Sequence, residues 1–175
     1  MKSPFITYIT IICFFAIFSL SAQTSSLVQT TEASGKHSML IAAVKATDID
    51  AILEHSGPFT VFAPSDAAFK RFSPAKLERL MNSNDKSKLK SLLSYHIVAG
   101  TLTASRILKA MCRGNGKASF TTIQGKKLEA HMDGYDIVLT DPLGNTARIT
   151  HADLNRSNGA GIVHEIDSVI VPSQM

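Results

Sequence analysis

Cysteine is scarce in this chain of 175 residues, which contains two cysteines and no tryptophan. Cys13 falls in an apolar N-terminal segment that we expect to be removed, which leaves Cys112 as the single thiol of the mature protein. A single thiol excludes an intramolecular disulfide, so the fold must be stabilised by packing. We expect a monomer, although Cys112 could link two chains through a disulfide if its side chain is exposed.

Metal-ligand spacing is absent as well. The six histidines and the one mature cysteine form no paired ligand motif, and HEID at residues 164–167 has no second histidine of a zinc-protease helix. Residues 153–159, DLNRSNG, resemble a calcium loop, but the glycine comes one residue late and His164 occupies the twelfth position. We therefore expect no metal and no cofactor, and interpret residues 153–159 as an Asx-rich turn.

A hydrophobic run long enough to span a bilayer is also missing. The longest run, residues 5–20, has about 16 residues, whereas about 20 are needed. A lysine precedes this run and small residues follow it, as in a secretory signal peptide cleaved near Ala22; an uncleaved anchor is the alternative. We expect a signal peptide at 1–22, a flexible segment at 23–36 and one domain at 37–173, in a secreted or periplasmic protein without a transmembrane span.

A strong excess of one charge is lacking, because 18 basic and 14 acidic residues give a net charge of +4. The chain is not a polycation, and aromatic residues do not alternate with the basic ones, so we expect no nucleic acid partner. One basic group could gather at an end of a sheet and attract acidic glycans or lipids: Lys109, Arg113, Lys117, Lys126 and Lys127. An ordinary solvated surface accounts for the same residues and is the interpretation we favour.

The periodicity of apolar residues places helices first and strands later. Helical spacing occurs in residues 40–53, 74–81, 89–93 and 104–111. Hydroxyl side chains suited to N-caps stand at Thr47, Ser65 and Thr103. A strand buried on both faces is predicted at 59–63, and alternating patterns predict further strands at 128–132, 135–139, 146–150 and 162–171. This order indicates an α+β fold.

Three blocks of sequence stand in a fixed order: GPFTVFAPSDAAF at residues 57–69, LLSYHIV at 92–98 and NGAGIVHEIDSVIVP at 158–172. Together they resemble the characteristic blocks of fasciclin-type domains, and the resemblance extends from about residue 40 to residue 172. Ala160 and Gly161 look inserted relative to that family's pattern. The resemblance implies a compact wedge of two small β-sheets with a layer of short helices.

The same resemblance implies an extracellular cell-adhesion module rather than an enzyme, and a part in partner binding for the Tyr95-His96 pair. We predict a protein that binds a protein, glycan or matrix partner through its surface, without catalytic residues. Alternation would place Tyr95 and His96 on opposite faces, one packed and the other near the surface. Asn155 begins a glycosylation triplet, which matters only in a host that has that machinery.

Two other classes of function stay open. A carrier would hold a small molecule or lipid in an apolar space between sheets and helices. A hydrolase would use Ser65 with His96 or His164 as its base. However, alanines stand two residues either side of Ser65, where the nucleophile-elbow motif needs glycines, so a helix cap accounts for this serine better. His164 shares an alternating face with isoleucines, which predicts a buried, hydrogen-bonded imidazole.

Overall fold

The computed structural model describes residue 31 and residues 35–154 and 161–173. The helices in this part are α3 (Ser38–Lys45), α4 (Ile49–His55), α5 (Asp66–Arg71), α6 (Pro74–Asn82), α7 (Ser87–Tyr95) and α8 (Ala104–Arg113). The strands are β1 (Phe59–Pro64), β2 (Ile97–Ala99), β3 (Lys117–Thr121), β4 (Lys127–Asp133), β5 (Asp136–Thr140), β6 (Thr146–Leu154) and β7 (Gly161–Ile166). Helices dominate the first half and strands the second, which confirms the predicted α+β class.

The strands form one mixed sheet in the order β2-β1-β7-β6-β5-β4-β3. β1 and β7 are parallel neighbours, and the other adjacent pairs are antiparallel. The sheet curls until its two edges meet, since Val98 of β2 bridges to Thr122 just after β3. The Ile123 amide also donates to the Ile97 carbonyl oxygen at 2.8 Å. The described strands are therefore continuous, and the expected division into two small sheets is not confirmed.

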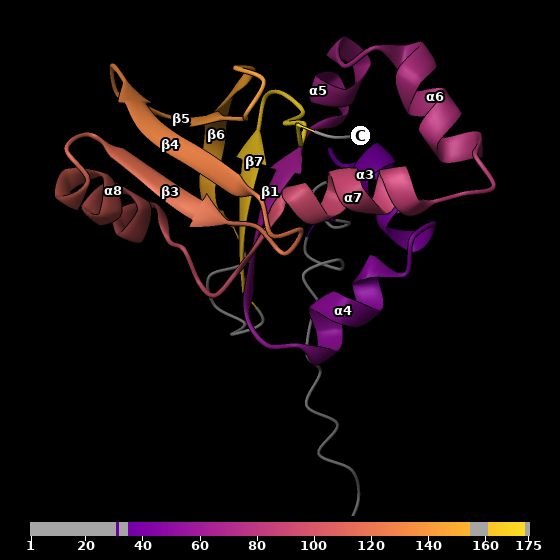
Figure 1. Cartoon of the computed structure of the whole chain (residues 1–175), viewed down its shortest axis with the longest axis horizontal. Coiled ribbons are helices and arrows are strands. Elements are labelled where there is room, and N and C mark those ends of the chain that lie inside the picture. Colours follow the sequence, from indigo (N-terminus) through magenta and orange to yellow (C-terminus); the bar gives the residue numbers. More distant parts are fainter. Residues whose placement is uncertain (1–30, 32–34, 155–160, 174–175) are drawn as a thin grey trace, which may run out of the picture.

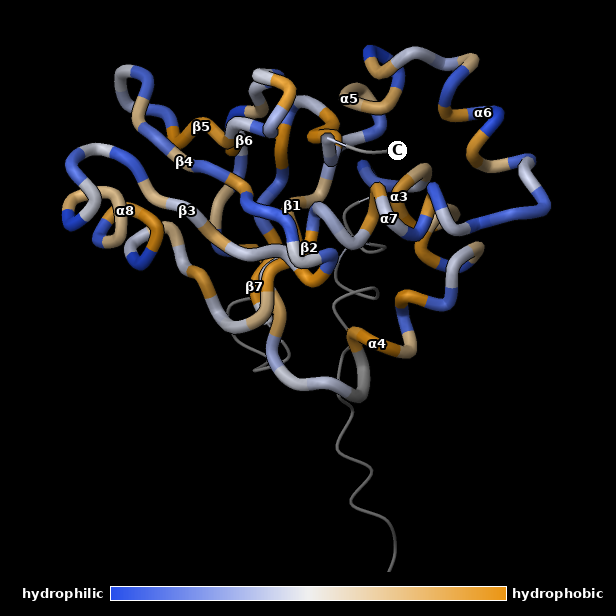
Figure 2. Tube along the Cα trace, viewed as in Figure 1, coloured by the Kyte–Doolittle hydropathy of each residue, from blue (hydrophilic) through white to orange (hydrophobic). Residues whose placement is uncertain are grey.

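Helices cover this sheet from two sides (Figure 1). α3 to α7 lie together on one side and α8 lies on the other, so that β1 runs between two hydrophobic cores. Val61 of β1 belongs to the core under α3 to α7, whereas the next residue, Phe62, belongs to the core under α8. Every residue of β1 is buried, which confirms the prediction for this strand. Figure 2 shows the hydrophobic character of the chain where β1 and β7 run side by side.

The predicted helix caps have different outcomes. The hydroxyls of Ser65 and Thr103 each accept a hydrogen bond at 3.2 Å from the amide three residues later, at the starts of α5 and α8, and both predictions are confirmed. Thr47 is not an N-cap. Its hydroxyl donates to the carbonyl oxygens of Ala43 and Val44, because Thr47 directly follows the C-cap of α3 and lies over the last turn of that helix.

The strands of the second half differ from the prediction in several places, and β6, for example, extends to Leu154 rather than to residue 150. Sequence reasoning missed β3, whose residues alternate between exposed and half-buried and whose composition is mostly polar. The strand after the β4–β5 turn begins at Asp136, because Tyr135 lies in the turn with its side chain fully exposed. The last strand ends at Ile166 rather than at residue 171, because side chains, not a neighbouring strand, bind the amides of Ile170 and Val171.

The predicted signal peptide and most of the Asx-rich turn, with Asn155, lie outside the described residues. In the described part, no helix has the length and apolar character needed to cross a membrane. The same part contains no group of three or more His, Cys, Asp or Glu side chains arranged to hold a metal ion. Gly161 begins β7 with a φ of 140°, and a Cβ there would lie 2.1 Å from the Phe59 carbonyl oxygen, so the close approach of β7 to β1 requires glycine.

Candidate functional site

The Tyr95-His96 pair lies at the end of α7, with Tyr95 as the last helical residue and His96 as the C-cap. The side chains are 0% and 2% exposed, so the prediction that one of them lies near the surface is wrong. The segment is helical rather than extended here, and the helix end is enclosed by the sheet. The Tyr95 hydroxyl donates to the Lys127 carbonyl oxygen of β4 at 2.7 Å. Neither ring reaches a partner directly in this arrangement, and their part in binding stays a prediction.

The His96 ring connects α7 to the C-terminal segment 167–173. Its Nε2 lies 3.3 Å from the Ile170 amide nitrogen, and its Nδ1 lies 2.9 Å from the Leu92 carbonyl oxygen. Because an amide can only donate, Nε2 is the acceptor, and the neutral ring carries its proton on Nδ1 and donates it to Leu92. Burial lowers the pKa of His96 to about 4, since desolvation penalises the charged form. The ring is therefore neutral near pH 7 and holds Ile170 in place.

Asp141 fastens the same C-terminal segment to the turn between β5 and β6. Its buried carboxylate accepts hydrogen bonds from the amides of Leu143, Asn145 and Val171 and from the Asn145 side chain, all at 2.9 Å. Burial, and next the negative charge of Asp141, raise the pKa of the Tyr95 hydroxyl. Sequence reasoning missed Asp141, although DPLGN at residues 141–145 is a turn pattern that could have identified it.

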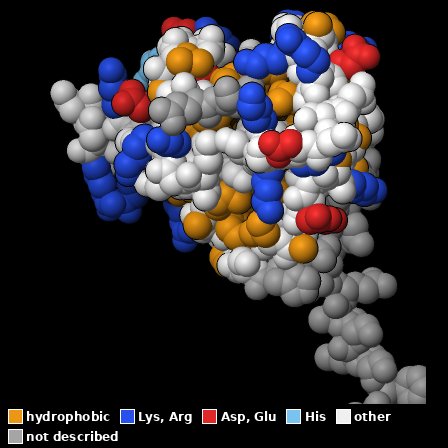
Figure 3. Space-filling view, turned by 45° about the vertical axis from the view of Figure 1, so that its right-hand side comes forward, with side chains coloured by type: hydrophobic (Ala, Val, Ile, Leu, Met, Phe, Trp, Pro, Cys, Tyr) orange, Lys and Arg blue, Asp and Glu red, His pale blue; other side chains and the backbone are white. Residues whose placement is uncertain are grey.

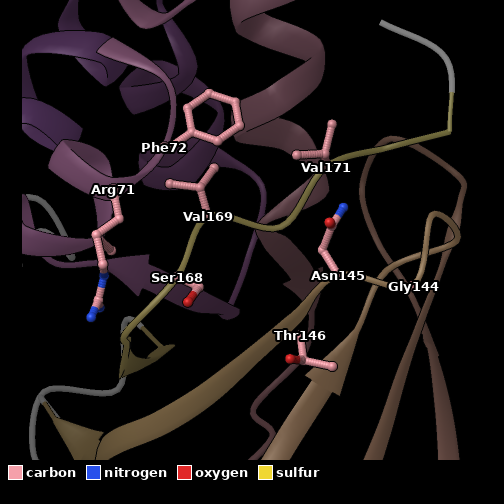
Figure 4. Close-up of a pocket in the computed structure, with 9 residues that line it drawn as sticks. Arg71, Phe72, Gly144, Asn145, Thr146, Ser168, Val169 and Val171 are labelled. Carbon is pink, nitrogen blue, oxygen red and sulfur yellow. The ribbon is translucent and has the colours of Figure 1, made fainter.

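A surface cleft is lined by residues of the same β5–β6 turn and C-terminal segment (Figure 4). It has a volume of about 440 Å³ and is bounded by α5, the β5–β6 turn and the C-terminal segment. Its apolar wall and its polar groups are formed by Phe72, Val169, Val171, Asn145, Thr146 and Ser168. Arg71, at one edge, donates a hydrogen bond to the Asp167 carbonyl oxygen. The cleft thus joins an apolar wall to a polar rim.

The C-terminal segment forms the floor of the cleft and pairs with no strand in the described part of the chain. Its side chains alternate, because Val169 and Val171 line the cleft while Ile170 belongs to the core under α8. The carbonyl oxygens of residues 168–171 accept no hydrogen bond from the described residues. Backbone of this kind can pair with an added strand. His96 and Asp141 hold this floor from behind by binding the amides of Ile170 and Val171.

The described residues around Ser65 do not form the catalytic arrangement that a hydrolase would need, and the Ser65 hydroxyl caps α5. His164 is fully buried; its Nε2 donates to the Leu102 carbonyl oxygen at 2.7 Å, and its Nδ1 accepts from the Asp153 amide at 3.2 Å. Burial lowers the pKa of His164. The predicted buried, hydrogen-bonded His164 is confirmed. Backbone groups bind both nitrogens of His164 and of His96, so neither ring is oriented toward a nucleophile.

Basic side chains form two separate groups on the surface. The group identified from the sequence is exposed on α8, at the start of β3 and around the start of β4: Lys109, Arg113, Lys117, Lys126 and Lys127. A second group, which the sequence did not single out, lines a hollow between α6 and α7 and consists of Lys76, Arg79 and Lys88. The first group lies on a helix and on strands, and the second surrounds a hollow.

Comparison with known proteins relates most of the chain to one family. The family model described as Fasciclin domain matches residues 35–172. Protein sll1483 of Synechocystis sp. is 33% identical over 159 residues, which are 90% of this chain and 80% of that protein. Periostin of Homo sapiens is 32% identical over 148 residues, which are 85% of this chain but 16% of periostin.

A solved structure shows the same fold. It is that of a FAS1 domain pair from the insect cell adhesion molecule fasciclin I, with a TM-score of 0.60 and 22% sequence identity. The match covers 79% of this chain and 46% of the insect chain. At this identity the likeness concerns the arrangement of helices and strands.

Proposed function

The chain belongs to the fasciclin domain family, and from this premise we propose that it is a non-catalytic adhesion module whose cleft holds an extended segment of a partner protein. The observation that carries the proposal is the floor of the cleft, a segment beside an apolar wall whose carbonyl oxygens at residues 168–171 accept no hydrogen bond from the described residues. The partner segment would pair with this backbone and place alternate apolar side chains against Phe72 and Val169. The insect relative of known structure is a cell adhesion molecule, which supports an adhesive role.

We place this module outside the cytoplasm, as a secreted or periplasmic protein. The proposed organisation is a signal peptide at residues 1–22, a flexible segment at 23–36 and the fasciclin-like domain at 37–173. The charge and hydropathy pattern of the N-terminus supports export. The match of the family model from residue 35 supports the start of the domain. The partner would then be an extracellular, envelope or matrix protein.

Tyr95 and His96 act in this proposal as positioning residues rather than as contacts. His96 binds the Ile170 amide, and the Tyr95 hydroxyl holds the end of α7 against β4. Loss of the His96 side chain would release the floor of the cleft, and loss of the Tyr95 side chain would loosen the end of α7 that carries His96. In this way a buried pair can contribute to adhesion.

The proposal is tested by blocking the cleft with one exposed substitution. Thr146 lines the cleft and is exposed, so Thr146→Arg places a long charged side chain at its mouth. Thr121→Arg is the matched control, since Thr121 is also exposed on a strand but lies on β3. Each immobilised protein is incubated with envelope and matrix fractions, and retained proteins are identified by mass spectrometry and confirmed by titration with the purified partner.

We expect the unmodified protein and Thr121→Arg to retain the same partner, and Thr146→Arg to lose it while keeping an unchanged melting temperature. Retention of that partner by Thr146→Arg would show that binding takes place elsewhere on the surface. Loss of partner binding in both variants would show that the added positive charge, and not the blocked cleft, prevents binding.

A carrier function is the second candidate, and the volume of the cleft favours it. About 440 Å³ falls within the range of roughly 300–1,000 Å³ that is typical of small-molecule sites. Mass spectrometry of organic extracts of the purified protein separates the two functions. A lipid or metabolite that is present in stoichiometric amount and absent from Thr146→Arg would favour the carrier over the adhesion module.

A further inference from the structure

A hollow of about 300 Å³ lies between α6 and α7 and shares no lining residue with the cleft. Its lining consists of Lys76, Arg79, Leu80, Ser83, Asp85 and Lys88. Three of these side chains are cationic and one is anionic, so the hollow carries an excess of positive charge. In the space-filling view, Lys and Arg side chains are prominent on the face that carries α6 and α7 (Figure 3).

The cations of the hollow are not neutralised by ion pairs. Within the described residues, none of Lys76, Arg79 and Lys88 takes part in a salt bridge. Asp85 accepts from the Ser87 amide at 2.8 Å and from the Ser87 hydroxyl at 2.9 Å, and its charge offsets only part of the positive charge, through an attraction to Lys88 that contributes to lowering the pKa of Asp85. Like charges that surround one concavity repel each other, and a bound anion would relieve this repulsion.

The basic side chains are held at the rim by local contacts. Lys76 and Arg79 stand three residues apart on α6 and therefore share a face of the helix. The Lys76 ammonium lies 5.6 Å from the centre of the Phe72 ring, a cation–π distance. The Arg79 Nε donates to the Ala75 carbonyl oxygen at 3.2 Å. This contact leaves the terminal nitrogens of the guanidinium free to form a two-pronged contact with a sulfate or carboxylate group.

We propose that the hollow between α6 and α7 binds the acidic sugar units of an anionic polysaccharide, through their sulfate or carboxylate groups. The cations supply the charge complement, Ser83 offers a hydroxyl, and the buried Leu80 forms an apolar base against which the face of a sugar ring can pack. A concave site suits a group that projects from a chain, whereas the flat headgroup layer of a membrane would reach only its rim. This site goes beyond the adhesive cleft and does not depend on it.

Isothermal titration of the purified protein with a sulfated oligosaccharide, and with its desulfated counterpart, tests the site. The double variant Arg79→Gln/Lys88→Gln removes two cations of the hollow. The matched control Lys109→Gln/Arg113→Gln removes one lysine and one arginine from the exposed surface of α8. All of these side chains are exposed, and a thermal melt confirms that each variant is folded.

We expect binding of the sulfated oligosaccharide that weakens with added salt, and weaker binding of the desulfated one, which keeps only its carboxylate groups. The variant in the hollow should bind about tenfold more weakly or worse, and the α8 variant should bind within about twofold of the unmodified protein. Equal losses in both variants would overturn the site in favour of general charge attraction, and an unchanged affinity in the hollow variant would also overturn it.

Two further measurements distinguish the polysaccharide site from a lipid site and from the cleft. The protein is also tested on vesicles of phosphatidylcholine and phosphatidylserine. If it binds these vesicles but not the oligosaccharide, and the hollow variant loses vesicle binding, the hollow is a site for anionic lipid and the polysaccharide proposal is overturned. Thr146→Arg should keep the oligosaccharide affinity. The two proposals, partner binding in the cleft and polysaccharide binding in the hollow, can therefore fail independently.

Discussion

Among single residues, buried polar side chains contribute most to the shape of the candidate site. His96 accepts from an amide 74 residues away, and Asp141 accepts from an amide 30 residues away. A buried amide without an acceptor costs about 1–3 kcal/mol. These two side chains therefore determine where the C-terminal segment lies, and with it the floor of the cleft.

The free energy of unfolding should decrease in mild acid, partly because of His96. Its folded pKa of about 4 lies below the 6.5 of an unfolded histidine, so the unfolded state binds more protons between these values. The stabilisation is complete above about pH 6.5 and is lost as the pH falls toward 4. We measure the free energy of unfolding in urea at pH 7 and at pH 5. The decrease between these two pH values should be smaller in His96→Gln than in the unmodified protein, by about 2 kcal/mol. The same dependence in both proteins would contradict a buried neutral ring.

Ser65→Ala should lower the free energy of unfolding by about 0.5–2 kcal/mol, because the first turn of α5 loses the acceptor for an amide. Ser73→Ala is the control, since Ser73 precedes α6 without a side-chain cap hydrogen bond. Chemical denaturation of both variants checks the difference. An equal loss at Ser73 would disprove the capping role, and loss of an esterase activity in folded Ser65→Ala would revive the hydrolase.

Among the secondary-structure elements, β1 is the strand on which both cores depend. It pairs with β2 on one side and in parallel with β7 on the other, and its two faces contact different helices. Phe62, from the second face, is fully buried and stacks on His164 with 5.5 Å between ring centroids. Damage to β1 should therefore reach every layer of the fold.

Phe62→Ala should cost about 3–5 kcal/mol, because it leaves a cavity between β1 and the core under α8. Phe120→Ala is the matched control, since Phe120 lies on the edge strand β3 and is only half-buried. The free energies of unfolding of both variants are measured in urea. A near-normal stability of Phe62→Ala would show that β1 is not central.

The β5–β6 turn depends on a carboxylate, so Asp141→Asn should destabilise the protein by about 1–3 kcal/mol. An amide nitrogen in place of Oδ2 accepts no hydrogen bond, so the Val171 amide and the Asn145 side chain would both lose their acceptor. Asp136→Asn should have a much smaller effect, because the ion pair of Asp136 with Arg148 is exposed. Urea unfolding compares the two, and equal losses would refute the anchoring role of Asp141.

Across the domain, the curled sheet separates the two proposed binding surfaces from the surface that carries the thiol. The cleft adjoins α5 and the hollow lies between α6 and α7, whereas α8 covers the opposite side of the sheet (Figure 1). Cys112 on α8 is exposed. A disulfide between two chains at this position would leave the cleft and the hollow open.

We expect the purified mature protein to be a monomer in reductant and to form a disulfide-linked dimer when a chemical oxidant is added. Each dimer forms by oxidation of two Cys112 thiols to one disulfide. Light scattering coupled to gel filtration measures the mass, and Cys112→Ser should stay monomeric under both conditions. A native thiol that fails to react with a small thiol reagent would contradict the exposure of Cys112.

Features that depend on neighbouring residues could be predicted from the sequence. Apolar periodicity was sufficient for the α+β order and for the double burial of β1, and hydroxyl position was sufficient for the caps at Ser65 and Thr103. Alternation also predicted the inward orientation of His164. These features involve a few consecutive residues, so the physical cause is visible in the order of the side chains.

The candidate site could not be predicted in this way. The burial of both Tyr95 and His96 results from the sheet closing over the end of α7, and the Asp141 carboxylate becomes an anchor because Val171 arrives beside it. The cations of the hollow meet because α6 and α7 fold against each other. Each of these depends on segments that are distant in the chain and adjacent in space, and burial and charge depend on what surrounds a side chain in three dimensions.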